Sequence, residues 1–202
     1  MATLLPQLAI DLTAPAPGLA TLFAPLVHGV RLEIGFGGAE HLVAQAQAYR
    51  AVGFIGCEPF VNGMAKALAA IDALGLANIR LHHGDATELL AWLPPASLQR
   101  VDLLYPDPWP KRRHWKRRFI QDPTVGEIAR VLDAGGELHF ATDWPDYAAW
   151  TLERLIRSPD FAWPAECADD WRKPWPDFAG TRYEAKAVRE GRTPCYLTFR
   201  RR

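Results

Sequence analysis

Short apolar runs alternate with helix-like segments along most of the chain, and this alternation limits the possible folds more than any other sequence feature. The apolar runs span residues 30–34, 54–57, 79–82, 98–104 and 136–142, and helical periodicity marks residues 39–49, 62–74, 123–132 and 146–156. Residues 193–200 look like a last strand, preceded by another near Phe161. Strands joined by such helices form right-handed crossovers. We therefore predict an α/β, Rossmann-like fold with a mostly parallel twisted sheet, helices on both faces and an antiparallel C-terminal strand.

The chain has 202 residues, a length that favours one domain. Residues 1–29 are apolar but interrupted by prolines, so we expect an N-terminal arm (1–29) that lies over a domain at 30–202. The arm contains no Lys or Arg, which argues against a targeting peptide. No apolar run reaches the roughly 20 residues that span a bilayer, so we expect no membrane partner.

The three cysteines lie far apart and form no paired motif: Cys57, Cys167 and Cys195. This pattern indicates a reducing compartment, the cytoplasm, and no structural metal. The sequence leaves a monomer and a homodimer equally open.

An acidic residue stands at or just after the end of each predicted parallel strand: Glu33, Glu58, Asp85, Asp107 and Asp143. Because the carboxyl ends of parallel strands meet at one edge of a sheet, and ligands of such folds bind there, these carboxylates should line one site.

A glycine turn follows the first strand, in the sequence Glu33-Ile-Gly35-Phe-Gly37. Such a turn lets a small ligand approach the backbone, although it also occurs in nicotinamide-binding domains or simply where a turn needs glycine dihedrals. The third position of the dinucleotide fingerprint is Glu40, whose charge would repel a pyrophosphate at the helix N-terminus. The turn therefore favours a ligand without phosphate.

S-adenosylmethionine suits this acidic edge, because it carries a sulfonium and an ammonium cation and offers hydroxyl and amino donors. Glu58 can accept hydrogen bonds from both ribose hydroxyls, and Asp85 can accept one from the adenine amino group. Either residue could instead be a helix cap or a solvated loop acid.

Residues 105–118 read Y-P-D-P-W-P-K-R-R-H-W-K-R-R and place a carboxylate, Asp107, between two prolines and ahead of a cationic run. Six of the eight residues from Lys111 to Arg118 are Lys or Arg, although the whole chain has a formal net charge of zero. We expect this run to bind nucleic-acid phosphates, with His114 and Trp115 able to stack on bases. A solvated helix start is the alternative.

Five segments together resemble one family: 32–37 (L-E-I-G-F-G), 56–60 (G-C-E-P-F), 106–118, 142–144 (T-D-W) and 181–187 (T-R-Y-E-A-K-A). They look like the bacterial tRNA (guanine-N7)-methyltransferases of the TrmB type, and the resemblance covers nearly everything from Val30 onward. It implies a class I methyltransferase fold and methyl transfer from S-adenosylmethionine to N7 of the variable-loop guanine of tRNA. Two departures are Ala39, where the family commonly has Gly, and a short arm without the basic segment of many relatives.

Carried over residue by residue, the resemblance implies two sets of binding residues and one catalytic residue, Asp107. The set for S-adenosylmethionine is Glu33, Gly35, Gly37, Glu58, Asp85, Ala86 and Asp107. The set for tRNA is Lys111, Arg113, His114, Asp143, Thr181, Arg182, Tyr183 and Glu184.

Guanine N7 has a lone pair and no proton, so its methylation requires no general base, and we interpret Asp107 as an electrostatic and positioning group. Two other functions stay open. One is a nucleic-acid amino-methyltransferase acting on adenine N6 or cytosine N4, although those enzymes usually carry a D-P-P-Y or N-P-P-Y order. The other is a non-catalytic tRNA-binding module that kept the fold.

Overall fold

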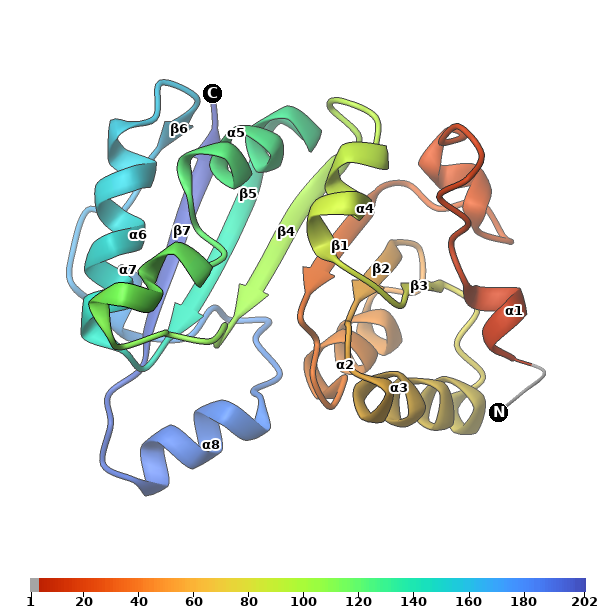
Figure 1. Cartoon of the computed structure of the whole chain (residues 1–202). Helices are drawn as coiled ribbons and strands as arrows, with labels where there is room; N and C mark the ends of the chain where they lie inside the picture. Colours follow the sequence, from red (N-terminus) through yellow and green to blue (C-terminus); the bar gives the residue numbers. More distant parts are fainter. Residues whose placement is uncertain (1–3) are drawn as a thin grey trace.

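The computed structural model describes residues 4–202, which form a seven-stranded sheet with helices on both faces (Figure 1). The strands are β1 (Val30–Ile34), β2 (Gly53–Cys57), β3 (Ile79–His82), β4 (Leu98–Leu104), β5 (Leu132–Thr142), β6 (Phe161–Ala162) and β7 (Cys195–Arg201). Their order is β3-β2-β1-β4-β5-β7-β6. Strands β1 to β5 pair in parallel, whereas β7 runs antiparallel to both β5 and β6. The predicted fold is confirmed.

The longer helices connect the strands as the periodicity predicted. They are α2 (Glu40–Ala48), α3 (Val61–Leu74), α5 (Asp122–Val131) and α6 (Pro145–Arg157). The structure adds short helices that the sequence pattern did not indicate: α1 (Leu5–Leu8), η1 (Leu19–Leu22), α4 (Ala86–Trp92), η2 (Arg112–Arg117), α7 (Asp169–Arg172) and α8 (Arg182–Arg189). Two of these, η2 and α8, carry residues of the predicted site.

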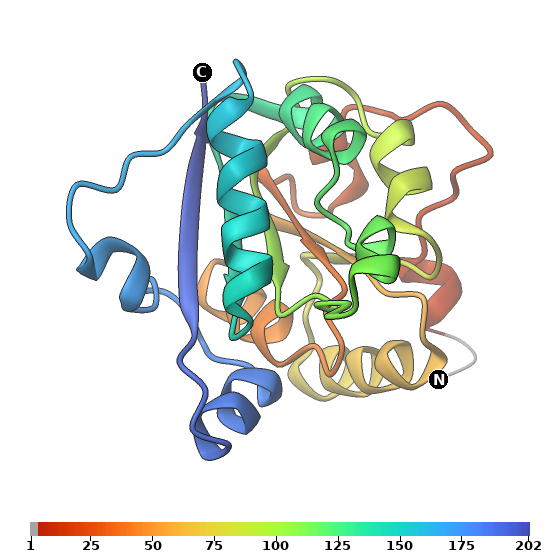
Figure 2. The same cartoon turned by 60° about the vertical axis from the view of Figure 1, so that its left-hand side comes forward.

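Two apolar clusters fill the two faces of the sheet. Helices α5 and α6 lie in front of one face of the sheet in Figure 2. On that face Leu32 and Ile34 of β1 pack among side chains of α4, α5 and α6. On the other face Phe54 of β2 packs among side chains of α2 and α3. Alternate residues of a strand point to opposite faces, so both layers share the same strands.

The N-terminal segment lies over both clusters from residue 4 onward. Leu8 packs in the cluster of α2 and α3, while Leu19, Phe23 and Val27 pack in the other one. The backbone amide of Ile10 donates to the carbonyl of Leu81 at 2.9 Å, beside the edge strand β3. The first three residues of the predicted arm lie outside the described part of the chain, and its boundary at residue 29 stays a prediction.

Within residues 4–202, no helix has the length and apolar character that crossing a membrane requires. The same residues contain no group of three or more His, Cys, Asp or Glu side chains placed to hold a metal ion. The three cysteines are free thiols.

Candidate active site

The carboxyl edge of the parallel strands brings most of the predicted site residues together. Strands β1 and β4 are neighbours, and the chain continues from β1 to β2 on one side and from β4 to β5 on the other, so the connections leave these two adjacent strand ends in opposite directions. Such a reversal opens a crevice at the strand ends. The arrowheads of these strands point toward one edge in Figure 1, and α8 lies at that edge. The acids at the strand ends are therefore neighbours in the fold.

The glycine turn after β1 adopts a conformation that only a few residue types accept easily. Gly35 and Gly37 have φ of 70° and 56°, and Ala39 has φ of 65° at the start of α2. A left-handed conformation strains any residue with a Cβ. Ala39 thus stands at a position whose backbone conformation favours glycine.

Glu58 joins the glycine turn to the end of β2. Its Oε2 accepts a hydrogen bond from the amide of Gly37 at 2.8 Å, and its Oε1 accepts one from the amide of Phe60 at 3.0 Å. Only 4% of Glu58 is exposed. Each carboxylate oxygen can accept a second hydrogen bond, so the arrangement fixes the carboxylate and leaves it acceptor capacity for hydroxyl donors.

Glu33 is buried beneath α2, where His41 contacts it through Nδ1 at 2.9 Å from Oε2. Burial raises the pKa of the Glu33 carboxyl above its ordinary value. Burial alone would lower the pKa of His41, but the adjacent carboxylate outweighs it and raises that pKa. Glu33 therefore supports the strand from which the glycine turn leaves, and it is about as deeply buried as Glu58.

Asp85 caps the N-terminus of α4. Its Oδ1 accepts hydrogen bonds from the amide and the hydroxyl of Thr87, both at 2.8 Å. Asp85 is thus a helix cap, as the alternative interpretation of this residue proposed. Both bonds use the same oxygen, so the cap and a role toward an adenine amino group are compatible. Ala86 follows as the first residue of α4 and is buried.

The loop that carries Asp107 is held in a strained conformation. Tyr105 and Trp109, on either side of the Pro-Asp-Pro sequence, have φ of 52° and 44°. Left-handed backbone at residues other than glycine is costly and persists where the surroundings impose it, commonly at functional sites. The side chain of Asp107 itself is exposed. The loop therefore presents a carboxylate to solvent on a stiff support.

Arg118 supplies part of that support, which corrects our expectation that the whole cationic run faces phosphates. It is 2% exposed, its Nε donates to the carbonyl of Pro108 at 2.9 Å, and its guanidinium lies 4.8 to 5.1 Å from the ring centres of Trp115, Tyr147 and Trp150. The guanidinium is thus held by aromatic faces and a backbone carbonyl. It cannot reach a phosphate from this position.

Trp115 is a second correction, because its ring packs against Trp150 with the ring centres 5.4 Å apart, and its indole nitrogen is buried. The expected base-stacking residue is part of the support instead. The other five cations of the run are exposed: Lys111, Arg112, Arg113, Lys116 and Arg117. His114 is half-buried, with its ring 5.8 Å from that of Trp109. The exposed cationic surface therefore contains five of the six cations that we expected there.

Helix α8 brings the segment 181–184 against the glycine turn. Thr181 caps the helix, accepting a hydrogen bond from the amide of Glu184 at 3.1 Å. A Cβ added to Gly37 would lie 3.1 Å from the ring of Tyr183 and 3.3 Å from the guanidinium of Arg182. The segment expected to bind tRNA thus touches the turn expected to bind the cofactor.

Glu184 and Asp143 differ in the internal partners of their carboxylates. Asp143 accepts a hydrogen bond from Nε of Arg192 within an ion pair. Glu184 accepts a hydrogen bond from the hydroxyl of Tyr196 and carries no cationic partner among the ion pairs of the described chain. Sequence reasoning missed Arg192 and Tyr196. The position of Tyr196 next to β5 could have been found only from the pairing register of β7.

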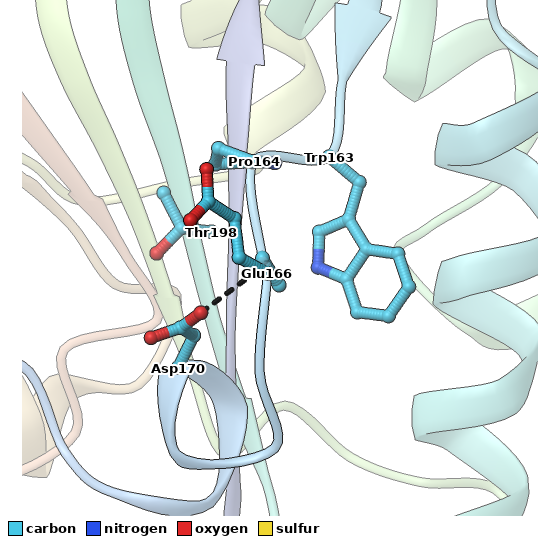
Figure 3. Close-up of a pocket in the computed structure, with 6 residues that line it drawn as sticks. Trp163, Pro164, Glu166, Asp170 and Thr198 are labelled. Carbon is cyan, nitrogen blue, oxygen red and sulfur yellow. Dashed lines mark hydrogen bonds between the residues drawn. The ribbon is translucent and has the colours of Figure 1, made fainter.

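A hollow of about 730 Å³ opens beside α8, and its lining includes three residues of the predicted tRNA set. The lining residues are Glu40, Ala179, Gly180, Thr181, Arg182, Glu184, Ala185, Val188 and Arg189. A smaller pocket of about 330 Å³, drawn in Figure 3, lies at β7 between Trp163 and Asp170. None of the predicted site residues lines that pocket, whose Asp170 accepts a hydrogen bond from the amide of Glu166 at 2.8 Å.

Comparison with known proteins gives one consistent family. Residues 28–197 match the Methyltransf_4 family, described as "Putative methyltransferase". The tRNA (guanine-N(7)-)-methyltransferase of Bradyrhizobium diazoefficiens is 63% identical over 98% of this chain and 84% of its own length. The protein of the same name from Rhodopseudomonas palustris strain BisA53 is 63% identical over the whole chain and 81% of its own length. The solved 16S rRNA methyltransferase KamB has a TM-score of 0.60 at 15% identity, covering 87% of this chain and 88% of its own.

Proposed function

The chain belongs to the tRNA (guanine-N7)-methyltransferase family and is an S-adenosylmethionine-dependent enzyme of tRNA, and we propose that the guanine it methylates lies in the variable loop. The observation that carries the proposal is the place of Asp107, on a stiff loop between the cofactor edge and the exposed cations of η2. A reacting base held there contacts both ligand sites. The target guanine takes part in tertiary pairing within folded tRNA, so it must be extracted before it reaches the loop.

The residues at the strand ends fit the chemistry of S-adenosylmethionine, the methyl donor. Its methyl group is carried on a positively charged sulfur, which suits an acidic edge. Glu58 is preset as an acceptor for ribose hydroxyls, and Asp85 keeps one oxygen for the adenine amino group. Gly35 and Gly37 leave the backbone open to the ligand, with Glu33 and Ala86 completing the set.

Asp107 acts by charge and position in this proposal. When N7 of guanine accepts a methyl group, the purine ring gains positive charge, and a nearby carboxylate stabilises that charge without removing a proton. Pro106 and Pro108 restrict the backbone on both sides of Asp107, and Arg118 holds the carbonyl of Pro108. The backbone that carries the carboxylate is therefore fixed before the substrate arrives.

Glu184 is the better of the two candidates for reading the base. Guanine presents two adjacent donors, N1–H and the amino group, and a carboxylate without a cationic partner can accept both, whereas adenine lacks this pair. Asp143 already forms an ion pair with Arg192, so we propose that it shapes the site and does not read the base. We assign Thr181, Arg182 and Tyr183 to the same base, and Lys111, Arg113 and His114 to the phosphates.

The test of this function is a methylation assay with tRNA transcripts and mapping of the product. We expect label from S-adenosylmethionine to enter tRNA as 7-methylguanosine, detected by mass spectrometry of nucleosides. A transcript with adenine in place of the variable-loop guanine should accept no label. Methyl groups on adenine N6 or cytosine N4 would establish the amino-methyltransferase alternative. Binding of tRNA without binding of S-adenosylmethionine in calorimetry would establish the non-catalytic module.

Replacing Lys111 by Ala should weaken tRNA binding and make it less sensitive to salt. One neutralised phosphate contributes about 0.7 to 0.9 to the slope of log affinity against log salt, so we expect the slope to fall by about that amount. Filter binding at several salt concentrations measures it. Arg50→Ala is the control. It removes an exposed charge just before β2, at the amino ends of the parallel strands, and should leave the slope unchanged. Equal slopes for the wild type and Lys111→Ala would place η2 away from phosphate.

We also propose that the protein works in the cytoplasm, where its tRNA substrate is found. The division into an arm (1–29) and a methyltransferase domain (30–202) is part of the same proposal. It is supported by the contact of residues 8–27 with both apolar clusters, because a segment spread over two clusters has no core of its own.

A further inference from the structure

One oxygen of the Glu184 carboxylate is already fixed inside the protein. The hydroxyl of Tyr196 donates a hydrogen bond to its Oε1, and a Cβ placed on Gly180 would lie 3.2 Å from its Oε2. Glu184 is half-buried on α8 and lines the hollow beside that helix, whereas Tyr196 is 4% exposed on β7. The carboxylate is thus anchored from the sheet and open toward the hollow.

Tyr196 can serve as an anchor because its ring cannot turn freely. Trp175 and Phe178 meet it edge to face, each with ring centres 5.6 Å away. Trp175 in turn donates from its indole nitrogen to Oγ1 of Thr198 at 2.7 Å and stacks on His139 at 4.2 Å. Edge-to-face aromatic contacts and a satisfied indole fix both rings. The hydroxyl of Tyr196 is therefore held in a defined place.

The chain segment that leads into α8 is tied to the same face of the sheet. Asp177 accepts a hydrogen bond from Nη1 of Arg100 on β4 at 2.8 Å, and the ring of Phe178 lies 5.3 Å from that of His41. These contacts fix the backbone a few residues before Thr181. The same face of the sheet therefore positions both α8 and Tyr196.

The anchor also lies close to the loop that carries Asp107. Tyr105, which precedes Pro106, packs in the same cluster as Tyr196. Burial raises the pKa of Tyr105, and the neighbouring hydroxyl of Tyr196 adds to the rise. Burial and the bond to Glu184 likewise raise the pKa of Tyr196, so it stays a donor. One cluster of tyrosines thus supports both the base-reading helix and the catalytic loop.

We propose that Tyr196 is a positioning residue for guanine recognition: its hydroxyl fixes the carboxylate of Glu184 so that both oxygens face the N1–H and amino donors of the base. This inference rests on the proposed role of Glu184. A carboxylate that can rotate must lose that freedom when the base binds, and an internal donor removes the cost in advance. The oxygen that Tyr196 contacts still has a second lone pair for the base.

A double-mutant cycle tests the proposal with the full-length enzyme, tRNA and S-adenosylmethionine. Tyr196→Phe removes one oxygen and keeps the ring, and Glu184→Gln replaces the double acceptor. We expect Tyr196→Phe to lower kcat/KM for tRNA about tenfold, the effect of losing one hydrogen bond to a charged group. KM for S-adenosylmethionine should stay within about twofold. In the Glu184→Gln background, adding Tyr196→Phe should change kcat/KM for tRNA by less than about twofold, because residues that act together are not additive.

Tyr49→Phe is the matched control, since Tyr49 lies at the end of α2 against Arg31 and outside the cluster. It should leave kcat/KM for tRNA and KM for S-adenosylmethionine unchanged, and melting temperatures of every variant show whether folding is affected. Effects of Tyr196→Phe and Glu184→Gln that multiply, a raised KM for S-adenosylmethionine, or a silent Tyr196→Phe beside a damaging Glu184→Gln would each overturn the positioning role. A silent Glu184→Gln would instead overturn the proposed reading of guanine by that residue.

Discussion

Replacing Asp107 by Ala is expected to lower the rate of methyl transfer about 100- to 1,000-fold, while affinity for tRNA changes by less than about threefold. Removing a preorganised group that stabilises transition-state charge commonly costs 10² to 10³ in rate, about 3 to 4 kcal/mol. Asp107 is exposed on a loop held by Tyr105, Trp109 and Arg118, so truncation should leave the loop in place. Single-turnover kinetics with saturating tRNA and S-adenosylmethionine isolate the chemical step, and filter binding measures the affinity.

Asp107→Asn separates charge from shape. If the negative charge stabilises the developing cation, the amide should be almost as inactive as Ala, because it keeps the volume and loses the charge. Asp122→Ala, an exposed acid at the start of α5, is the matched control and should keep normal turnover. Substantial turnover by Asp107→Ala would refute the role that we give to this residue.

Replacing Gly63 by Ala is expected to weaken binding of S-adenosylmethionine about 100-fold. A Cβ at this position of α3 would lie 2.5 Å from the carbonyl oxygen of Gly37 and 2.7 Å from Cγ of Glu58. Neither neighbour can move without displacing the glycine turn or the carboxylate hydrogen-bonded to it. Overpacking of this kind costs about 1 to 3 kcal/mol, and the loss should fall on the cofactor site. Calorimetry with S-adenosylmethionine measures it.

Gly126→Ala is the matched control, because Gly126 also lies within a helix, α5, and no atom lies within 4 Å of the position of an added Cβ. There the substitution should raise the free energy of unfolding by about 0.5 to 1 kcal/mol, the usual gain of Ala over Gly in a helix. Cofactor affinity should stay unchanged. Normal cofactor binding by Gly63→Ala would show that the turn tolerates displacement and that Glu58 is not preset by it.

The parallel strands were predictable from the sequence because each contains a short, largely apolar run that ends near Gly, Pro or an acid. The start of β5 was not, since Asp133 to Gly136 breaks the apolar pattern although the strand begins at Leu132. Helix α8 escaped prediction because it is short and mostly polar, and with Ala187 as its one buried residue it has no broad apolar face. A helix without such a face depends on its cap and on contacts from elsewhere in the chain.

The sequence predicted which residues lie near one another in the site, but it did not predict the contacts of each residue. The rule that parallel strands end at one edge placed Glu58 and Asp107 together. A run of cations carries no periodic signal for the one that points inward, so the burial of Arg118 could not be foreseen. The hydrogen bond between Tyr196 and Glu184 joins a strand to a helix that the pattern did not indicate.

Tyr183 and Arg182 lie against Gly37, so the segment that we assign to tRNA adjoins the turn that we assign to the cofactor. A ligand that moves atoms of one site therefore also moves atoms of the other site. For this reason we expect the two binding equilibria to share a coupling free energy. Such a coupling is reciprocal: the factor by which S-adenosylmethionine changes the affinity for tRNA is the factor by which tRNA changes the affinity for S-adenosylmethionine. Methyl transfer changes both partners at once, because the cofactor loses a methyl group and a positive charge and the guanine gains them, so the products have a coupling free energy of their own.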